Sequence, residues 1–127
     1  DSLGAFLKEV MRMFGPVSDI FTREAIEDNT IGDLKIKKGT CLTYSLVALN
    51  FNEKFHEDPY TFNPNRFLDP NSRTRVSMKK YPCSFIPFSA GPRTCIGIQL
   101  AQIEAKILFS LFIQKYTWAL KDKNYVW

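Results

Sequence analysis

The chain has 127 residues, of which 45% are hydrophobic and 14% aromatic, a composition that excludes intrinsic disorder and suits one domain with a modest core. Its formal net charge of +4 is too small an excess to argue for nucleic acid as a partner. The three cysteines, Cys41, Cys83 and Cys95, are odd in number and far apart in the sequence. They therefore argue against a disulfide framework and for a reducing environment, and no paired spacing supports a zinc site.

The first predicted element is a helix over residues 3–14, with Ser2 as a candidate N-cap and a Gly-Pro pair at its end. Apolar residues recur along one side of it. Glu9 and Arg12 lie three residues apart and therefore share a face. Taken alone, such a pair is a solvent-exposed ion pair that contributes only a few tenths of a kcal/mol.

A β-rich stretch follows this helix. Short strands are expected at residues 25–27 and 34–36, on either side of turn-forming residues, with a further strand at residues 41–46. This part of the chain is therefore predicted to contain small hairpins rather than a large sheet.

Residues 58–67 read D-P-Y-T-F-N-P-N-R-F, and their prolines indicate a surface loop when the segment is taken alone. His56, the only histidine, precedes them in a polar stretch beside Glu57, and we expect it at the surface. Further on, four basic residues lie close together. They are expected in a solvated loop, or else as a patch that binds an acidic protein partner. These residues are Arg73, Arg75, Lys79 and Lys80.

The most informative stretch is residues 88–101, which read F-S-A-G-P-R-T-C-I-G-I-Q-L-A. Cys95 lies between a glycine-bearing loop and the predicted start of a helix. Arg93 and the unpaired N–H groups at that helix start both favour the thiolate form of Cys95. Gly91 and Gly97 allow tight turns or the close approach of a flat ligand. A lone thiolate suits a single axial bond to a metal centre, whereas a small buried cysteine at a helix start is the plain alternative.

The final predicted helix spans about residues 96–115 and carries an apolar stripe with core periodicity. We expect this stripe to be buried against further helices of a longer protein. A strand is expected to begin at residues 117–120. No apolar run is long enough to cross a membrane, and because the chain starts without an initiator methionine, we expect it to begin in the middle of a longer protein. The stripe consists of Ile96, Leu100, Ile103, Ile107 and Leu111.

Three motifs in this order resemble those of the cytochrome P450 family. Residues 88–101 meet every fixed position of its haem-binding loop, F-x-x-G-x-R-x-C-x-G-x-x-x-A. Glu9 and Arg12 match the E-x-x-R of the family's K helix. Residues 58–67 are similar to its D-P-x-x-F-x-P-E-R-F segment, with Arg66 in the arginine position. The order and spacing of the three motifs strengthen each of the individual matches.

The resemblance implies a mainly α fold with small β-hairpins, of the α+β class. Residues 1–127 would form a partial cytochrome P450 domain, truncated at both ends and running from just before the K helix to just after the L helix. The I helix, with the acid and alcohol residues that relay protons to bound O2, would lie outside it. Asn65 stands where the family usually has glutamate, which puts a neighbouring ion pair in doubt.

The resemblance also implies a site. Cys95 would be the axial ligand of a haem b iron. Glu9, Arg12 and Arg66 would form a buried structural triad that fixes the loop carrying the thiolate. Arg23 would hold a haem propionate, although it could equally be an exposed strand residue. The haem-binding candidates are Phe88, Gly91, Arg93, Gly97, Ala101 and Arg23, and the substrate-pocket candidates are Ile20 and Phe21, which could equally be core residues.

The implied function is that of a haem-thiolate monooxygenase, which inserts one oxygen atom of O2 into a lipophilic organic substrate and reduces the other to water. Electrons would come from NAD(P)H through a partner resembling NADPH-cytochrome P450 reductase. The longer protein is expected to be anchored at the endoplasmic reticulum membrane on its cytosolic face, and the isolated fragment to be inactive. Two alternatives remain open. One is a haem-thiolate isomerase or dehydratase that needs no redox partner, which the unaltered cysteine loop disfavours, and the other is a non-catalytic haem-binding pseudo-enzyme or sensor.

Overall fold

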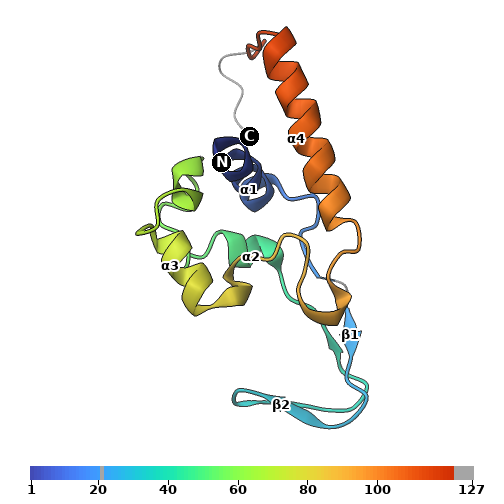
Figure 1. Cartoon of the computed structure of the whole chain (residues 1–127). Helices are drawn as coiled ribbons and strands as arrows, with labels where there is room; N and C mark the ends of the chain where they lie inside the picture. The colour runs from blue at the N-terminus through green and yellow to red at the C-terminus, as the bar shows by residue number, and fades with distance from the viewer. Residues whose placement is uncertain (21, 122–127) are drawn as a thin grey trace. The chain divides into compact units, whose positions relative to one another are not determined.

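The computed structural model describes residues 1–20 and 22–121. It is divided into two compact units, Asp1–Cys95 and Ile96–Trp127 (Figure 1). Helices occur in both units, and every strand of the described residues belongs to the first. The prediction of a mainly α chain with small β-hairpins is confirmed.

The first helix, α1 (Ser2–Phe14), forms where the sequence predicts it. Its N-cap is Asp1 rather than Ser2, because the Asp1 carboxylate accepts a backbone hydrogen bond in the first turn at 3.1 Å. The face that α1 buries is partly charged, since it includes Glu9 and Arg12. The exposed ion pair expected from the i,i+3 spacing alone is thus a buried one.

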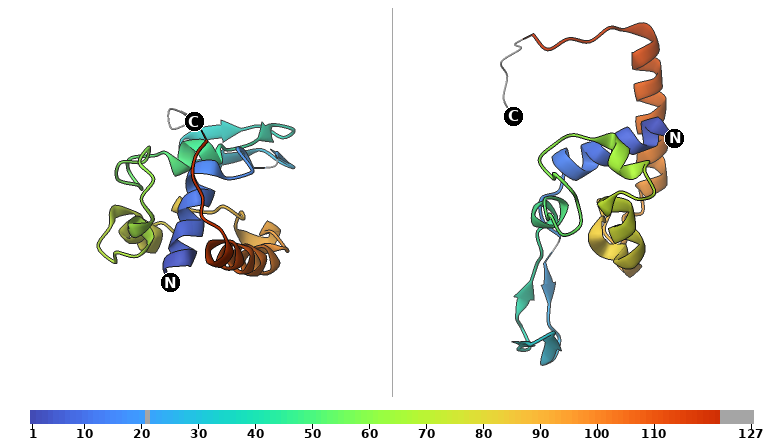
Figure 2. Two further views of the ribbon diagram at one scale, coloured as in Figure 1. Left: turned by 90° about the horizontal axis from the view of Figure 1, so that it is seen from above. Right: turned by 90° about the vertical axis from the view of Figure 1, so that its left-hand side faces the viewer.

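Two antiparallel ribbons follow α1. β1 (Arg23–Glu24) pairs with β4 (Cys41–Leu42), and β2 (Asn29–Ile31) pairs with β3 (Leu34–Ile36). The turn between β2 and β3 contains Gly32, whose φ of +57° favours glycine. Figures 1 and 2 show the β2–β3 hairpin as the continuation of the β1–β4 ribbon.

The predicted strands are partly wrong. Residues 25–27 form no strand; residues 26 and 27 form a bend, and Asp28 holds the end of this bend by accepting a hydrogen bond from the Lys38 amide at 2.9 Å. The strand predicted at residues 41–46 ends earlier, because Ser45 already caps the next helix. Ala25 itself still pairs across the ribbon, because its backbone is hydrogen-bonded to Gly39 at 2.7 Å and to Thr40 at 2.9 Å. A side-chain hydrogen bond therefore ends the regular pairing after Ala25 and again at Ser45.

Short helical elements fill the rest of the first unit. Ser72 begins one of them, because its Oγ accepts a hydrogen bond from the Arg75 amide at 3.1 Å. The basic residues expected in a solvated loop therefore lie on a helix. The elements are α2 (Leu46–Asn50), η1 (Pro64–Phe67), α3 (Arg73–Lys80), η2 (Pro82–Ser84) and η3 (Gly91–Arg93).

The core of the first unit is small and mixed in character. Ala5, Phe67 and Phe85 form its apolar cluster, and Met11 and Met78 pack against them. The largest fully buried side chains among the described residues are all polar or charged. This unit therefore depends on a buried hydrogen-bond network as well as on apolar contact. Those side chains are Arg12, Arg66, His56, Glu9, Thr74 and Ser84.

The second unit contains α4 (Ile98–Lys115), which begins two residues later than predicted. The predicted apolar stripe is exposed, from 48% at Leu111 to 103% at Ile96, so its burial against further helices stays a prediction. Residues 117–120 form no strand, and the prediction of one there is wrong. Within the described part of the chain, no helix has the length and apolar character needed to cross a membrane.

Candidate functional site

The loop that carries Cys95 is closed by its own backbone. The Cys95 amide donates a hydrogen bond to the Phe88 carbonyl at 2.9 Å, and the Ser89 amide donates to Ile86 at 2.9 Å. Within the loop, the Thr94 amide and hydroxyl both donate to the Gly91 carbonyl, at 3.0 and 2.8 Å. Residues 88–95, here named the Cys95 loop, therefore form a defined turn rather than an open segment.

Gly91 meets a conformational requirement of this loop. Its φ is +74°, in the left-handed region where a side chain is strained. A Cβ built on Gly91 would meet no atom within 4 Å, so the space beside it is open. A flat group could approach the backbone on this side.

Cys95 is exposed and not disulfide-bonded. Arg93, at the end of η3, is exposed as well. No group of three or more metal-ligating side chains exists among the described residues. A single free thiol without protein co-ligands does not suit a zinc site, which needs three or four protein donors. It does suit a prosthetic group that brings its own equatorial donors, as haem does.

The remaining haem-binding and substrate-pocket candidates lie at the start of α4, on β1 and in the segment before β1. Gly97 is the N-cap residue of α4, and its carbonyl accepts a hydrogen bond from the Ala101 amide at 2.9 Å. Arg23 is exposed on β1. Ile20 is half-buried and its amide donates to the Tyr44 carbonyl at 3.0 Å. Phe21 lies outside the described residues.

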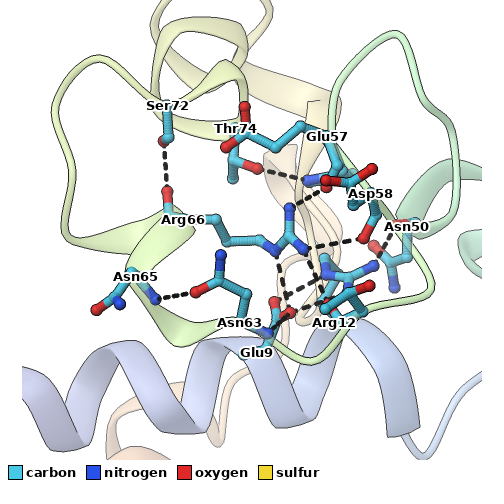
Figure 3. A network of polar contacts seen from close by, with 12 residues as sticks. Glu9, Arg12, Asn50, Glu57, Asp58, Asn63, Asn65, Arg66, Ser72 and Thr74 are labelled. Carbon is cyan, nitrogen blue, oxygen red and sulfur yellow. Dashed lines mark hydrogen bonds and ion pairs between the residues drawn. The ribbon is translucent and has the colours of Figure 1, made fainter.

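Three predicted residues meet in the interior of the first unit (Figure 3). Glu9 Oε2 accepts a hydrogen bond from Arg12 Nε at 2.8 Å, and Oε1 accepts from Arg12 Nη2 at 2.9 Å and from Arg66 Nε at 3.0 Å. All three side chains are buried. Glu9, Arg12 and Arg66, here named the buried cluster, thus place two guanidinium groups around one carboxylate.

The buried cluster also holds the surrounding backbone. Arg12 donates to the Asn50 carbonyl at 2.9 Å. Arg66 donates to three carbonyls of the segment before η1, with distances of 3.1 Å to Asp58 and 2.9 Å to Thr61, and a third bond to Glu57. Asp58 needs such support, since its φ of +41° is uncommon for a non-glycine residue.

Asn65 stands where the family usually has glutamate, and the structure shows whether the buried cluster needs a carboxylate there. Asn65 is exposed, and its amide donates to Asn63 Oδ1 at 3.1 Å. The Asn63 amide in turn donates to Glu9 Oε1 at 2.8 Å. The buried cluster therefore forms without a carboxylate at position 65.

The environment of Glu9 keeps it ionised. Burial raises the pKa of this carboxyl, but the hydrogen bonds from Arg12 and from the Asn63 amide, with the charges of Arg12 and Arg66, outweigh burial and hold the pKa below its usual value. The carboxylate is therefore the charge that balances the two arginines.

The expectation that His56 lies at the surface is wrong. Its side chain is fully buried, and its Nδ1 lies 3.0 Å from the Thr74 hydroxyl of α3. Burial, with the charges of Arg12 and Arg66, lowers the pKa of His56 to about 4. Its polar sequence neighbours gave no signal of this, because the residues that cover it come from α3 and from the segment after η2.

The first unit thus combines an exposed free cysteine on a closed loop with a buried Glu-Arg-Arg cluster. The family model for cytochrome P450 matches residues 2–126, and the chain belongs to the cytochrome P450 family.

Relatives support this membership. The chain is 38% identical over 120 residues to the steroid 17-alpha-hydroxylase/17,20 lyase of Ovis aries, covering 94% of this chain and 23% of the relative. It is 37% identical over 125 residues to the cytokinin hydroxylase of Arabidopsis thaliana, covering 98% of this chain and 23% of the relative. The chain therefore spans about a quarter of the length of these curated relatives.

Solved structures are similar as well. A zebra fish cytochrome P450 with abiraterone has a TM-score of 0.76 and 34% identity, over 91% of this chain and 26% of that one. The retinoic acid-bound cyanobacterial CYP120A1 has a TM-score of 0.80 and 29% identity, over 89% of this chain and 25% of that one.

Proposed function

We propose that the chain is the cysteine-bearing part of a haem-thiolate monooxygenase that inserts one oxygen atom of O2 into a lipophilic substrate. The Cys95 loop carries the proposal, because it presents a free, exposed thiol from a closed turn in a chain of the cytochrome P450 family. Relatives named as hydroxylases support the reaction class. A steroid hydroxylase and a structure bound to retinoic acid support an apolar substrate.

In this proposal haem b supplies the activation of O2 when bound, and a thiolate ligand favours that chemistry by donating electron density to iron. The chain's own residues bind and orient the group. Cys95 provides the thiolate, and Arg93 and Arg23 provide fixed cations for the propionates. Phe88 excludes water from the sulfur, and Gly91 leaves room for the flat ring.

The remaining proposed roles are structural or belong to the pocket. Small residues at the start of α4 allow close approach to the haem. The buried cluster fixes the backbone from which the Cys95 loop departs. The residues in these roles are Gly97 and Ala101 for the haem, Glu9, Arg12 and Arg66 for the cluster, and Ile20 and Phe21 for the substrate pocket.

We further propose that residues 1–127 are one part of a single, longer P450 domain, because the chain spans 23% of its curated relatives. The residues that relay protons to O2 would then lie elsewhere in that protein. Anchorage at the cytosolic face of the endoplasmic reticulum membrane belongs to the same proposal.

An electron donor with an acidic surface fits the charge distribution. Residues 70–103 hold five of the 17 basic residues and none of the 13 acidic ones, so the rest of the chain has a net charge of −1. The five are Arg73, Arg75, Lys79, Lys80 and Arg93. Since complementary charge steers protein encounters, we place the docking of a reductase-like partner at α3 and the Cys95 loop.

The absorption spectrum of the reduced, CO-bound full-length protein tests the haem-thiolate assignment. We expect a Soret band at the position typical of thiolate ligation, and we expect Cys95→Ala to abolish it. Cys83→Ala is the matched control, because Cys83 is also a free, exposed cysteine, and this variant should keep the band. An imidazole-type band in the unaltered protein, or a thiolate band that survives Cys95→Ala, would refute the assignment.

A further inference from the structure

We propose that His56 is a positioning residue for the Cys95 loop: as a neutral imidazole it attaches the segment before η1 to α3 and Phe85, and protonation of His56 breaks this attachment. The proposal rests on the proposed function only for the role of the Cys95 loop. The contacts of His56 themselves stand independently of haem.

His56 contacts the two parts of the chain that lead to the Cys95 loop. Its Nδ1 is 3.0 Å from the hydroxyl of Thr74, which is fully buried in the first turn of α3. Its ring meets that of Phe85 edge to face, with centroids 6.5 Å apart. Phe85 is buried, packs on Phe67 of η1 at 4.9 Å, and lies three residues before Phe88. The Cys95 loop therefore departs from a segment that His56 helps to hold.

The charged groups around His56 favour its neutral form. α1 contributes Arg12 and Glu9, and η1 contributes Arg66. α3 faces the ring with the Thr74 hydroxyl, and η2 with the Ser84 backbone. The Glu9 carboxylate already accepts hydrogen bonds from both arginines, so an imidazolium would be a third buried cation beside one carboxylate.

The second ring nitrogen does little to offset this cost. Nε2 is buried and makes no hydrogen bond of ordinary distance and angle among the described residues. The Ser84 backbone favours the protonated ring, but its effect is smaller than those of burial and of the two arginines, which favour the neutral ring. Movement of the ring toward water would relieve the burial and the repulsion from the arginines, and it would separate His56 from Thr74 and Phe85.

The direction of the pH effect follows from these contacts. Burial and the two arginines lower the pKa of His56 from 6.5 to about 4. Between these pH values, His56 binds a proton in the open form, in which the ring has moved to water, and stays neutral in the closed form, which is the arrangement in the structure. The closed arrangement is therefore fully favoured above about pH 6.5 and weakens as the pH falls toward 4. Between about pH 7.5 and about pH 5, the opening equilibrium should increase about 30-fold.

Hydrogen exchange of the full-length, haem-loaded protein measures this opening without reference to activity. We expect the amides of α3 to lose protection by roughly that factor over the same pH interval, after correction for the intrinsic pH dependence of exchange. The reduced, CO-bound spectrum, recorded over the same interval, should lose its thiolate-type band only in proportion to the opened fraction, which stays small while the opening equilibrium is well below one. If Cys95 were not the ligand, the band would be absent at every pH while the exchange result would still decide the role of His56.

His56→Phe keeps the ring contact with Phe85 and cannot be protonated, but it leaves the buried Thr74 hydroxyl without a partner. The double variant His56→Phe/Thr74→Val replaces both polar groups with apolar side chains of similar outline, which costs less than leaving one buried polar group unpaired. We expect both variants to lose the pH dependence of α3 exchange, and the double variant to recover protection at neutral pH relative to His56→Phe.

A second pair of variants does not alter His56. Thr74→Val should increase α3 exchange at neutral pH, and Thr74→Ser, which keeps the hydroxyl, should restore protection. An unchanged pH dependence in the double variant His56→Phe/Thr74→Val would overturn the proposal. Equal protection in Thr74→Val and in the unaltered protein would overturn it as well.

Discussion

Glu9 is the one carboxylate that receives hydrogen bonds from Arg12, Arg66 and the Asn63 amide, and its removal is the most damaging single change we expect in the first unit. Glu9→Gln keeps the size of the side chain but leaves two buried guanidinium groups without a counter-charge. Breaking a buried ion pair in this way typically costs about 3–5 kcal/mol. The expected result is a loss of that size in the free energy of unfolding, measured by urea denaturation of the full-length protein.

Glu24→Gln is the matched control, because Glu24 is exposed on β1 and the same change there should alter stability by less than about 0.5 kcal/mol. The Glu9 contribution should also vanish with acid. Its pKa lies below the ordinary 4.5, so the stabilisation is present above that value and is lost as the pH falls beneath it. Equal stability of Glu9→Gln and Glu24→Gln at neutral pH would show that the carboxylate does not hold the buried cluster.

Single residues also show where sequence reasoning succeeds and where it fails. Glu9, Arg12 and Arg66 could be predicted to meet because they belong to two motifs that occur in the order typical of the family. His56 could not, because its burial depends on Thr74, which follows it by 18 residues and comes from a helix that has no apolar periodicity. Nothing in the sequence around His56 indicates that its side chain is buried.

At the scale of elements, α3 tests the proposed docking of an electron donor. Lys79 and Lys80 are exposed in its last turn. Reversing both charges should lower the rate of electron transfer from a reductase about tenfold at low ionic strength, because complementary charges accelerate encounter. The difference should shrink as salt is added, since screening acts on exposed charges. Stopped-flow reduction of the haem over a series of salt concentrations measures both effects.

Lys35→Glu/Lys38→Glu provides the matched control, because these exposed lysines lie on the β2–β3 hairpin and its neighbouring turn and the change in net charge is the same. We expect this variant to reduce at nearly the unaltered rate. Equal slowing in the two double variants would mean that total charge, and not a docking site at α3, governs the reaction.

The elements differ in how far the sequence predicts them. α1 carries both an apolar stripe and charged residues that match a known helix motif, and it forms where expected. α3 has eight residues and begins because Ser72 caps it, so its signal is a single hydrogen bond rather than a repeating pattern. The bend before Asp28 is likewise held by side-chain contacts, because Asp28 accepts hydrogen bonds from the Lys38 amide and from Lys37 Nζ. Elements set by a few side-chain contacts are the ones that periodicity misses.

At the scale of the whole molecule, α4 determines what the 127-residue chain can do alone. Its apolar side chains are exposed along the helix, with 62% at Leu100 and 54% at both Ile103 and Ile107. Soluble proteins rarely leave so large an apolar surface in water. In the proposed longer protein, further helices cover this surface, and the chain of 127 residues lacks them.

We therefore predict that the 127-residue chain, prepared alone, self-associates and does not hold haem at one equivalent. Association should bury the face of α4, so Ile103→Lys/Ile107→Lys should shift the chain toward the monomer in size-exclusion chromatography with light scattering. The variant should still fail to bind haem stoichiometrically in a spectral titration, because the Cys95 loop offers a ligand for only one side of the ring. Gln99→Lys/Gln114→Lys is the matched control, because it adds the same charge at exposed polar positions of the same helix, and it should alter association much less. A monomeric, fully haem-loaded chain would contradict the prediction and would mean that these 127 residues complete the site unaided.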